Sequence, residues 1–234
     1  MKNTVPETIN AYKEFTELYE HYNRQEKELI EKFKQDKHDI SKKKKQLDHL
    51  LSTLFLNQIN NIPSQMLLAS EKMYLIKLCA FQSRTRWQLI YKASQDGFAS
   101  KDFHRKCDSV SQTLTIVKTI DGFIFGGYTE QPWHSNDEYS KDENAFLFSL
   151  VNHQNDPIKL ECVKPEFAIY NYEEYGPTFG RGYDIFISDH SNSNLESCCN
   201  LVVYTHARYE CDSTVLAGTE NFQTDDIEVF AKIN

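Results

Sequence analysis

Six cysteines and the polar side chains near them are the residues of this chain with the clearest chemical potential. Cys107 follows His104, Arg105 and Lys106, and such a basic neighbourhood favours the thiolate that a sensing or sacrificial thiol needs. We therefore hypothesise that Cys107 is the most reactive thiol. A buried cysteine that packs as a small apolar side chain is the alternative. Because the cysteines form no CxxC pair, we expect reduced thiols.

Metal and cofactor sites are not expected from the spacing of the other polar residues. The densest group of potential ligands contains two adjacent cysteines, which rarely chelate one zinc ion together. Asp189 begins a calcium-like stretch, but Asn194 and Asn200 stand where glycine and glutamate are needed. Gly180-x-Gly182 lacks the third glycine of a dinucleotide loop, and the P-loop and GxSxG patterns are absent. The group of potential zinc ligands with the two adjacent cysteines consists of Cys198, Cys199, His206 and Cys211.

A glycine-rich segment, 175–182, is the best candidate for binding a partner. Proline fixes φ in a turn and glycines permit positive φ, so a purely structural turn is one interpretation. The other is a recognition loop that presents Tyr175, Phe179 and Arg181. Trp133 is a second candidate anchor, with a place in the core as its alternative. The segment consists of Tyr175, Gly176, Pro177, Thr178, Phe179, Gly180, Arg181 and Gly182.

Charge argues against nucleic acid as the main ligand. The chain has a net charge of −8, and the acidic excess lies after residue 60, where it repels phosphate backbones. The lysines at 42–45 form the one basic run, which we interpret as a solvated helix face; a nuclear-import signal or a nucleic-acid contact is the alternative. A nucleic-acid-associated regulator is therefore the alternative function, and an enzyme of unrecognised chemistry is a second.

The elements that must position these residues divide the chain in two, at 1–62 and 63–234. Neither glycine nor proline occurs between Pro6 and Pro63, so the first part can form one long helix. Its apolar residues recur in alternating steps of three and four, as in a coiled-coil seam, and predict a homo-oligomer. A lone amphipathic helix packed on its own domain is the alternative. The seam comprises Tyr12, Phe15, Tyr19, Tyr22, Leu29, Phe33, Ile40, Leu47, Leu50 and Leu54.

The second part reads as short strands with turn signals between them, which predicts a two-sheet antiparallel β-sandwich with a few flanking helices, an α+β fold. Asp121-Gly122 predicts a hairpin with positive φ at both turn residues. Gly126-Gly127 predicts a bulge or a close backbone approach. Expected helices are 70–80 and 99–107, and expected strands are 86–92, 113–119, 123–129, 145–150, 158–162, 167–172, 184–188, 201–205 and 227–232.

Several segments of this second part, taken in order, resemble the TLDc domain, the family associated with oxidation resistance. The resemblance covers about 66–234 of the chain. Each motif is weak alone, whereas the ordered set is specific. The motifs are RWQLIY (86–91) with DGF (96–98), FHRKC (103–107), FGGY (125–128) with Trp133, AFLFSL (145–150), YGPTFG (175–180), Gly182 with DI (184–185), and IEVF (227–230).

The resemblance implies a two-sheet β-sandwich, a role in tolerance of oxidative stress and, for some members, binding to the vacuolar proton-pumping ATPase. It implies no established reaction, so an adaptor or regulator is expected in place of an enzyme. Glu228 in the closing motif is interpreted as an outward strand residue or a local hydrogen-bond partner, with a buried active carboxylate as the alternative. The 234 residues contain no segment expected to form the lysin-motif or Rab-GAP domains of some relatives.

The location expected from the sequence is cytoplasmic, with the nucleus as the alternative because of the lysines at 42–45. Residues 1–10 contain no apolar segment typical of a secretory signal. No apolar stretch approaches the roughly 20 residues that a bilayer requires, so membrane insertion is not expected.

Overall fold

The computed structural model describes residues 60–81, 85–206 and 212–233. Ile62–Cys79 and Thr85–Asn234 form one compact unit. The predicted seam, from Tyr12 to Leu54, and the lysines at 42–45 lie outside the described residues. Self-association through the seam therefore stays a prediction.

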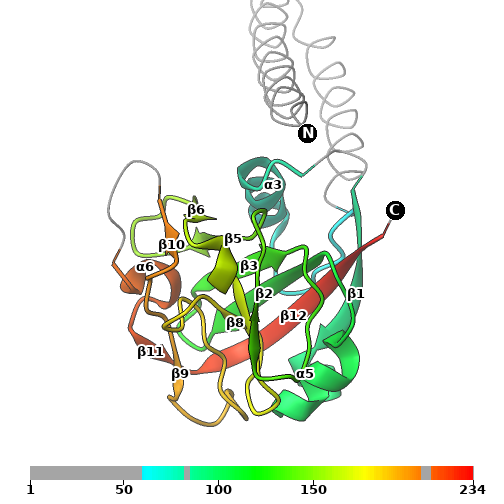
Figure 1. Cartoon of the computed structure of the whole chain (residues 1–234). Helices are drawn as coiled ribbons and strands as arrows, with labels where there is room; N and C mark the ends of the chain where they lie inside the picture. The colour runs from blue at the N-terminus through cyan, green and yellow to red at the C-terminus, as the bar shows by residue number, and fades with distance from the viewer. Residues whose placement is uncertain (1–59, 82–84, 207–211, 234) are drawn as a thin grey trace, which may run out of the picture. The chain divides into compact units, whose positions relative to one another are not determined.

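Seven strands form one antiparallel sheet in which the last strand of the chain lies between the first two (Figure 1). The C-terminal strand thereby ties the two ends of the compact unit together. The sheet contains, in spatial order, β1 (Arg86–Lys92), β12 (Thr224–Ile233), β2 (Thr113–Thr119), β3 (Ile124–Thr129), β5 (Phe146–Val151), β6 (Ile158–Cys162) and β10 (Tyr204–Thr205).

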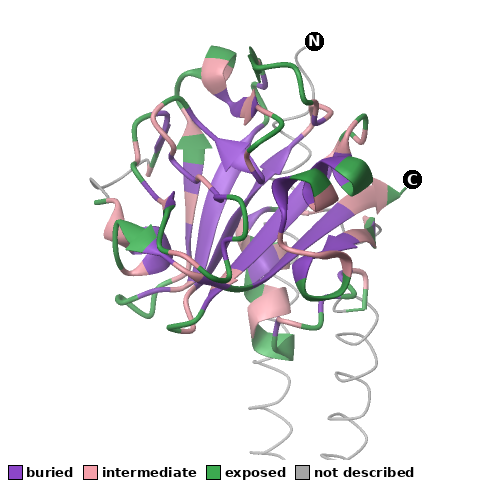
Figure 2. Ribbon diagram, turned by 90° about the horizontal axis from the view of Figure 1, so that it is seen from below, coloured by how far each residue is buried: buried purple, intermediate pink, exposed green. Residues whose placement is uncertain are grey.

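A second layer covers one face of this sheet. Val117 and Phe125 of the sheet share a core with Phe179 and Phe222 of the second layer, and the central strands are buried along most of their length (Figure 2). Within the described residues this layer comprises two small sheets and irregular chain. Its elements are β4 (Glu138–Ser140), β7 (Ile169–Asn171) and β8 (Thr178–Phe179) in one sheet, β9 (Ser197–Cys198) and β11 (Asn221–Phe222) in the other, η1 (Pro165–Phe167) and α6 (Thr214–Ala217).

The opposite face of the large sheet is covered by the chain that precedes β1. Ile116 and Phe230 belong to this face because strand side chains alternate, and both are fully buried. Leu75 of α3 (Ala69–Leu78) is buried as well, and α3 contacts β5. Glu71 stabilises the start of α3, because its carboxylate accepts a 2.7 Å hydrogen bond from the Leu68 N–H.

Two short helices follow β1 and complete the unit. They are α4 (Ala93–Asp96) and α5 (Ser100–Cys107). Phe103 and Cys107 of α5 belong to the core, and Phe103 makes edge-to-face contact with the Tyr91 ring of β1 at a centroid distance of 5.8 Å. The predicted helix at 99–107 is therefore confirmed, with one face packed inward.

The predicted strands 86–92, 113–119 and 158–162 are confirmed to the residue. The second sheet of the expected sandwich is interrupted: 184–188 makes only isolated bridges, and of 201–205 only Tyr204–Thr205 is a strand. Asp184 gives the physical reason. One of its carboxylate oxygens accepts hydrogen bonds of 2.8 Å from three successive backbone N–H groups, those of Val202, Val203 and Tyr204, so these groups need no strand partner.

The predicted hairpin between β2 and β3 is present, but its loop differs from the prediction. Only Gly122 has a positive φ, +89°, so the expectation for Asp121 is wrong. The Gly122 N–H donates to the Thr119 carbonyl at 3.0 Å, and three residues separate Thr119 from its partner Phe123. A three-residue loop ends with one left-handed glycine and therefore needs positive φ at one position only.

Gly126 and Gly127 permit the close approach that the sequence predicts. A Cβ atom on Gly126 would lie 1.9 Å from the Thr115 carbonyl oxygen of the neighbouring strand. A Cβ atom on Gly127 would lie 2.7 Å from the Phe179 ring of the second layer. Glycine at these positions therefore lets β2 and the second layer both approach β3 closely.

Candidate protein-binding surface

The glycine-rich segment 175–182 is largely part of the packed second layer. Tyr175 and Gly182 are half-buried and Arg181 is exposed. Phe179 is fully buried, so the expectation that it is presented to a partner is wrong, and the structural-turn interpretation fits most of the segment. The buried members are Gly176, Pro177, Thr178, Phe179 and Gly180.

Trp133 belongs to the core, as the alternative interpretation of this residue holds. Its side chain is 1% exposed, and its indole N–H donates a 2.8 Å hydrogen bond to Thr113 Oγ1. Its ring meets Phe103 and Phe179 edge-to-face at centroid distances of 5.3 and 5.5 Å. An indole satisfied in this way has no surface left for a partner, so the anchor expectation is wrong.

Cys107 is also fully buried, which argues against a reactive thiol and fits the alternative of a cysteine that packs as a small apolar side chain. Burial raises the pKa of the Cys107 thiol, and nearby carboxylates raise it further. The basic neighbours do not offset this effect, because each is engaged by a carboxylate: His104 by Asp108 at 2.8 Å, Arg105 by Asp102 at 3.0 Å and Lys106 by Asp96 at 2.8 Å.

Seven aromatic rings make a connected patch on the second layer, which we call the aromatic face. All seven are half-buried or exposed. Neighbouring ring centroids lie between 4.7 and 6.2 Å apart. Such a patch is a common property of protein-interaction surfaces, where tyrosine is enriched. The aromatic face consists of Phe167, Tyr139, Tyr170, Tyr172, Tyr175, Tyr183 and Phe186.

Strand alternation places the tyrosines on the outer side. Tyr139 of β4 pairs with Tyr170 of β7, and their rings lie 4.7 Å apart. Tyr172 follows two residues after Tyr170 and shares its side, whereas Asn171 between them points inward and is fully buried.

Buried polar side chains fix the backbone under the aromatic face. The Asn171 amide donates to the Glu138 carbonyl at 3.2 Å and to Ser140 Oγ at 2.9 Å, and its oxygen accepts from the His134 N–H at 3.1 Å. These bonds hold β4 against β7. The satisfied buried amide therefore preorganises the position of Tyr139.

His104 fixes the turn that carries Tyr172 and Tyr175. Its Nε2 lies 2.9 Å from the carbonyl oxygen of each of these residues, and its Nδ1 lies 2.8 Å from Asp108 Oδ1. Both ring nitrogens thus face oxygen atoms, and these contacts tie α5 to the turn. Ser135 Oγ donates to the other Asp108 oxygen at 2.7 Å, so the serine lies on the aspartate and not at Nε2, and the arrangement is no acyl-transfer triad.

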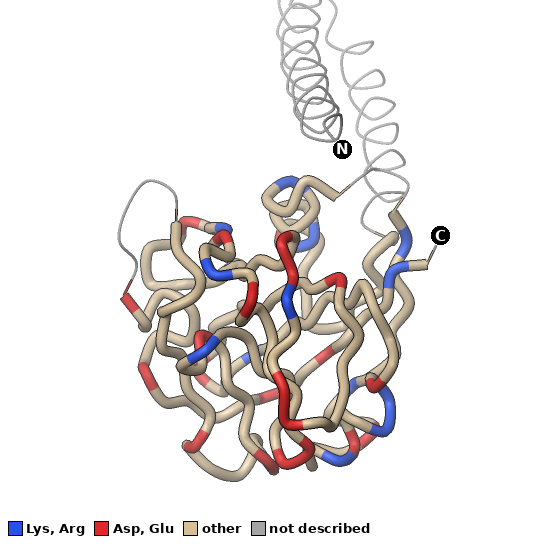
Figure 3. Tube along the Cα trace, viewed as in Figure 1, with Lys and Arg blue, Asp and Glu red and all other residues tan. Residues whose placement is uncertain are grey.

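Carboxylates flank the aromatic face, and acidic positions occur along many segments of the domain (Figure 3). Asp137, Glu138, Glu173 and Glu174 are all exposed, and none forms an ion pair with lysine or arginine within the described ranges.

Several phenols of the face remain protonated donors at neutral pH. A hydrogen bond to Asp137 raises the pKa of Tyr170, and the charge of Glu174 raises the pKa of Tyr172. A hydrogen bond with Tyr175, together with burial, raises the pKa of Tyr183 to about 12. The face therefore presents neutral rings with negative charge at their margin.

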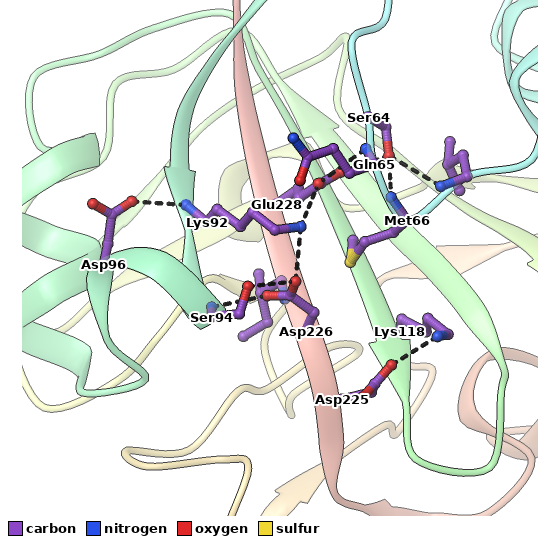
Figure 4. A network of polar contacts seen from close by, with 12 residues as sticks. Ser64, Gln65, Met66, Lys92, Ser94, Asp96, Lys118, Asp225, Asp226 and Glu228 are labelled. Atoms are coloured by element: carbon purple, nitrogen blue, oxygen red, sulfur yellow. Dashed lines mark hydrogen bonds and ion pairs between the residues drawn. The ribbon is translucent and has the colours of Figure 1, made fainter.

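Glu228 belongs to a buried polar network and not to the outer surface (Figure 4). Lys92 Nζ lies 2.7 Å from Glu228 Oε1 and 2.8 Å from Asp226 Oδ2, and Ser64 Oγ donates to Glu228 Oε2 at 2.5 Å. Burial opposes the charge on Lys92, but hydrogen bonds to both carboxylates outweigh it and raise the Lys92 pKa. The local-partner interpretation of Glu228 fits, because the network joins the chain before α3 to the sheet.

No group of three or more histidine, cysteine or acidic residues in the described part of the chain is arranged to hold a metal ion. Cys211, a member of the cysteine-histidine group in the sequence, lies outside the described residues. Among the described residues, no helix combines the length and apolar character needed to cross a bilayer.

Comparison with protein families matches residues 60–232 to the TLDc domain. The chain belongs to the TLDc domain family. The match covers nearly all of the compact unit, so both layers, the aromatic face and the Glu228 network are parts of this TLDc domain.

The chain matches about a third or less of the length of the curated relatives. The MTOR-associated protein MEAK7 of Gallus gallus is 25% identical over 169 residues, which are 62% of this chain and 31% of the relative. The human protein of the same name is 22% identical over 175 residues, or 68% of this chain and 35% of the relative. Human nuclear receptor coactivator 7 is 32% identical over 68 residues, 29% of this chain and 7% of the relative. The matched part thus spans a minor share of each relative.

Sequence reasoning missed most of the aromatic face of this TLDc domain. It singled out Tyr175 and Arg181, and the guanidinium of Arg181 lies 4.9 Å from the centroid of the Phe167 ring at the edge of the face. The alternation Tyr-Asn-Tyr at 170–172 is a signal that could have found the outward tyrosines. No local pattern indicates that β4 pairs with β7, because that contact joins residues about thirty positions apart.

Proposed function

We propose that this chain is a non-catalytic adaptor or regulator of the TLDc type, which binds protein partners through its aromatic face. The observation that carries the proposal is the connected patch of outward rings on a preorganised backbone. Preorganised aromatic side chains offer large contact area at a small cost in conformational entropy, which is what a binding surface requires.

The buried polar groups that a catalytic site would require form hydrogen bonds and ion pairs that stabilise the fold. Asp184 caps three backbone N–H groups, His104 binds two carbonyls and Glu228 pairs with Lys92. The relatives support the same direction, because their names describe one as MTOR-associated and another as a nuclear receptor coactivator. The names of both relatives are compatible with an adaptor or regulator.

The finer proposal is a cytoplasmic role in tolerance of oxidative stress through binding of the vacuolar proton-pumping ATPase. It comes from the family resemblance, and the seam from Tyr12 to Leu54 supplies valence or a docking helix in this scheme. Oxidation tolerance in this scheme does not require a reactive cysteine. Burial raises the pKa of Cys107 and of Cys199, so these thiols are poor peroxide targets.

Affinity capture with the full chain tests the proposal. The bait is compared with a Tyr139→Ser/Tyr172→Ser variant, and lysates are prepared with magnesium-ATP or with peroxide. Tyr74→Ser is the matched control, because Tyr74 is 52% exposed on α3, away from the aromatic face. Pump subunits recovered by the native and control baits but lost from the double variant support the proposal. If no pump subunit is recovered, the pump is refuted as a partner. If every bait recovers all captured proteins equally, the aromatic face is refuted as the binding surface.

Valence is tested on the full chain by light scattering. A Leu47→Glu/Leu50→Glu variant places two charges on the predicted seam and is expected to reduce the molar mass to that of the monomer. If the native chain is already monomeric, the adaptor acts with a single binding surface.

A further inference from the structure

Arg181 shows how the aromatic face receives a cation. The guanidinium carbon lies 4.9 Å from the centroid of the Phe167 ring, and Phe167 in turn contacts Tyr139 edge-to-face at 5.2 Å. A guanidinium stacked on an aromatic ring is a favourable cation–π contact. The face thus already accommodates one arginine, supplied by the domain itself.

The negative charges around the aromatic face favour the binding of further cationic groups. Glu138 and Glu173 are exposed and form no ion pair with lysine or arginine among the described residues. The phenol groups of Tyr170 and Tyr172 donate to Asp137 and to Glu174, so these two donors are already used and are not offered to an anionic ligand. Negative charge next to aromatic rings complements a positively charged partner.

The ring geometry favours a flexible cationic segment over a flat ligand. The Tyr172 and Tyr175 rings meet at an interplanar angle of 74°, Tyr139 and Phe167 at 84°, and Tyr175 and Tyr183 at 78°. Tyr170 is nearly parallel to Tyr172, at 15°, and is tilted by 32° to Tyr139, so only part of the face is level. The edge-to-face pairs interrupt the continuous platform on which a sugar or a base would stack. They leave separate ring faces that individual guanidinium groups can cover.

From these observations we infer that the aromatic face binds an arginine-bearing basic segment of a partner protein, with guanidinium groups on the tyrosine rings and salt bridges to the flanking carboxylates. The inference rests on the proposed adaptor function and specifies the chemistry of its partner.

The test measures binding of a fluorescent peptide with four Arg-Gly repeats to the full chain by fluorescence polarisation. Peptides with Lys-Gly or Glu-Gly repeats and a linear oligosaccharide are the comparison probes. The Arg-Gly peptide is expected to bind more tightly than the Lys-Gly peptide, because guanidinium stacks on aromatic rings better than ammonium does. Its affinity is expected to fall as salt is raised, because the flanking charges are exposed.

Two variants assign the binding to the face. Glu138→Gln/Glu173→Gln is expected to weaken the Arg-Gly peptide roughly threefold to tenfold, since exposed ion pairs each contribute modestly. Tyr139→Leu keeps an apolar side chain but removes a ring, and roughly threefold weakening is expected. The control Asp121→Asn/Asp156→Asn removes the same charge from two hairpin turns and is expected to leave affinity unchanged.

Three results would overturn the inference: no binding of the Arg-Gly peptide, equal weakening by the Gln and Asn double variants, or preferential binding of the oligosaccharide. The adaptor function and the cationic partner can be refuted independently of each other. If lysate partners still depend on Tyr139 and Tyr172 while the Gln double variant captures them normally, the adaptor stands and the cationic partner is refuted.

Discussion

Asp184→Asn examines the electrostatic cost of the buried carboxylate that organises the second layer. Asp184 is fully buried; Oδ1 accepts three backbone N–H groups, whereas no hydrogen-bond partner for Oδ2 is present in the described structure. Oδ2 lies over Gly180, where a Cβ atom would be only 2.0 Å away. Asparagine keeps the acceptor oxygen and the shape but carries no charge at any pH.

Burial raises the pKa of Asp184 from 3.8 to about 6, against the opposing effect of the backbone N–H donors. A carboxyl group whose pKa is higher in the folded state contributes stability that is complete below its unfolded pKa and is lost as pH rises through the folded value. The rise corresponds to about 3 kcal/mol in total, of which about 2 kcal/mol is lost between pH 4 and pH 7. Asp184→Asn lacks this loss.

The assay is urea unfolding of the native chain and the variant across this pH range. The free energy of unfolding of the variant, minus that of the native chain, is expected to increase by about 2 kcal/mol from pH 4 to pH 7. Asp121→Asn, in the exposed β2–β3 turn, is the control and should show no such trend. A constant difference would mean that the N–H donors offset burial, and a difference that decreases with pH would mean that they outweigh it. Either result would refute the reasoning.

Three further predictions concern the packing of the domain. Gly126→Ala is expected to lower the free energy of unfolding by roughly 2–5 kcal/mol in urea titrations, because the Thr115 backbone cannot move away from the new methyl group. Lys92→Met leaves the Glu228 carboxylate buried without its cation and is expected to cost roughly 3–5 kcal/mol, whereas adding Glu228→Gln should restore part of that loss. Cys107 is expected to resist alkylation in the native chain and to react only after unfolding, as mass spectrometry of the labelled peptides would show.

Each of these predictions has a contrary result. Gly122→Ala, at a position with open space but φ of +89°, should cost only about 1 kcal/mol, and an equal loss at both glycines would contradict the close approach of β2 and β3. A Lys92→Met/Glu228→Gln variant no more stable than Lys92→Met would show that the two charges are not coupled. Labelling of native Cys107 at the rate of an exposed thiol would contradict its burial.

Local sequence pattern predicted the elements that are specified by their own residue types and by the glycines and prolines next to them. Strands 86–92, 113–119 and 158–162 follow from β-forming runs between breakers. Gly126-Gly127 predicted a bulge or a close backbone approach, and the close approach is present. The ordered motifs also identified the family that the comparison confirms. These strands, turns and motifs depend on residues that are close together in the sequence, so they can be predicted from the sequence alone.

Tertiary structure alone decided what the polar and aromatic residues do. The basic residues before Cys107 suggested a thiolate, yet carboxylates at Asp96, Asp102 and Asp108 engage them and the thiol is buried. Glu228 was interpreted as an outward strand residue or a local hydrogen-bond partner, and it is buried because the segment before α3 folds over it and supplies Ser64.

The aromatic face likewise exists only because β4 pairs with β7 and brings Tyr139 beside Tyr170. Composition and local pattern determine which elements form, because backbone propensity and turn chemistry act over a few residues. Burial, charge pairing and shared surfaces depend on contacts between residues distant in the chain, and the packing of the whole domain sets those contacts.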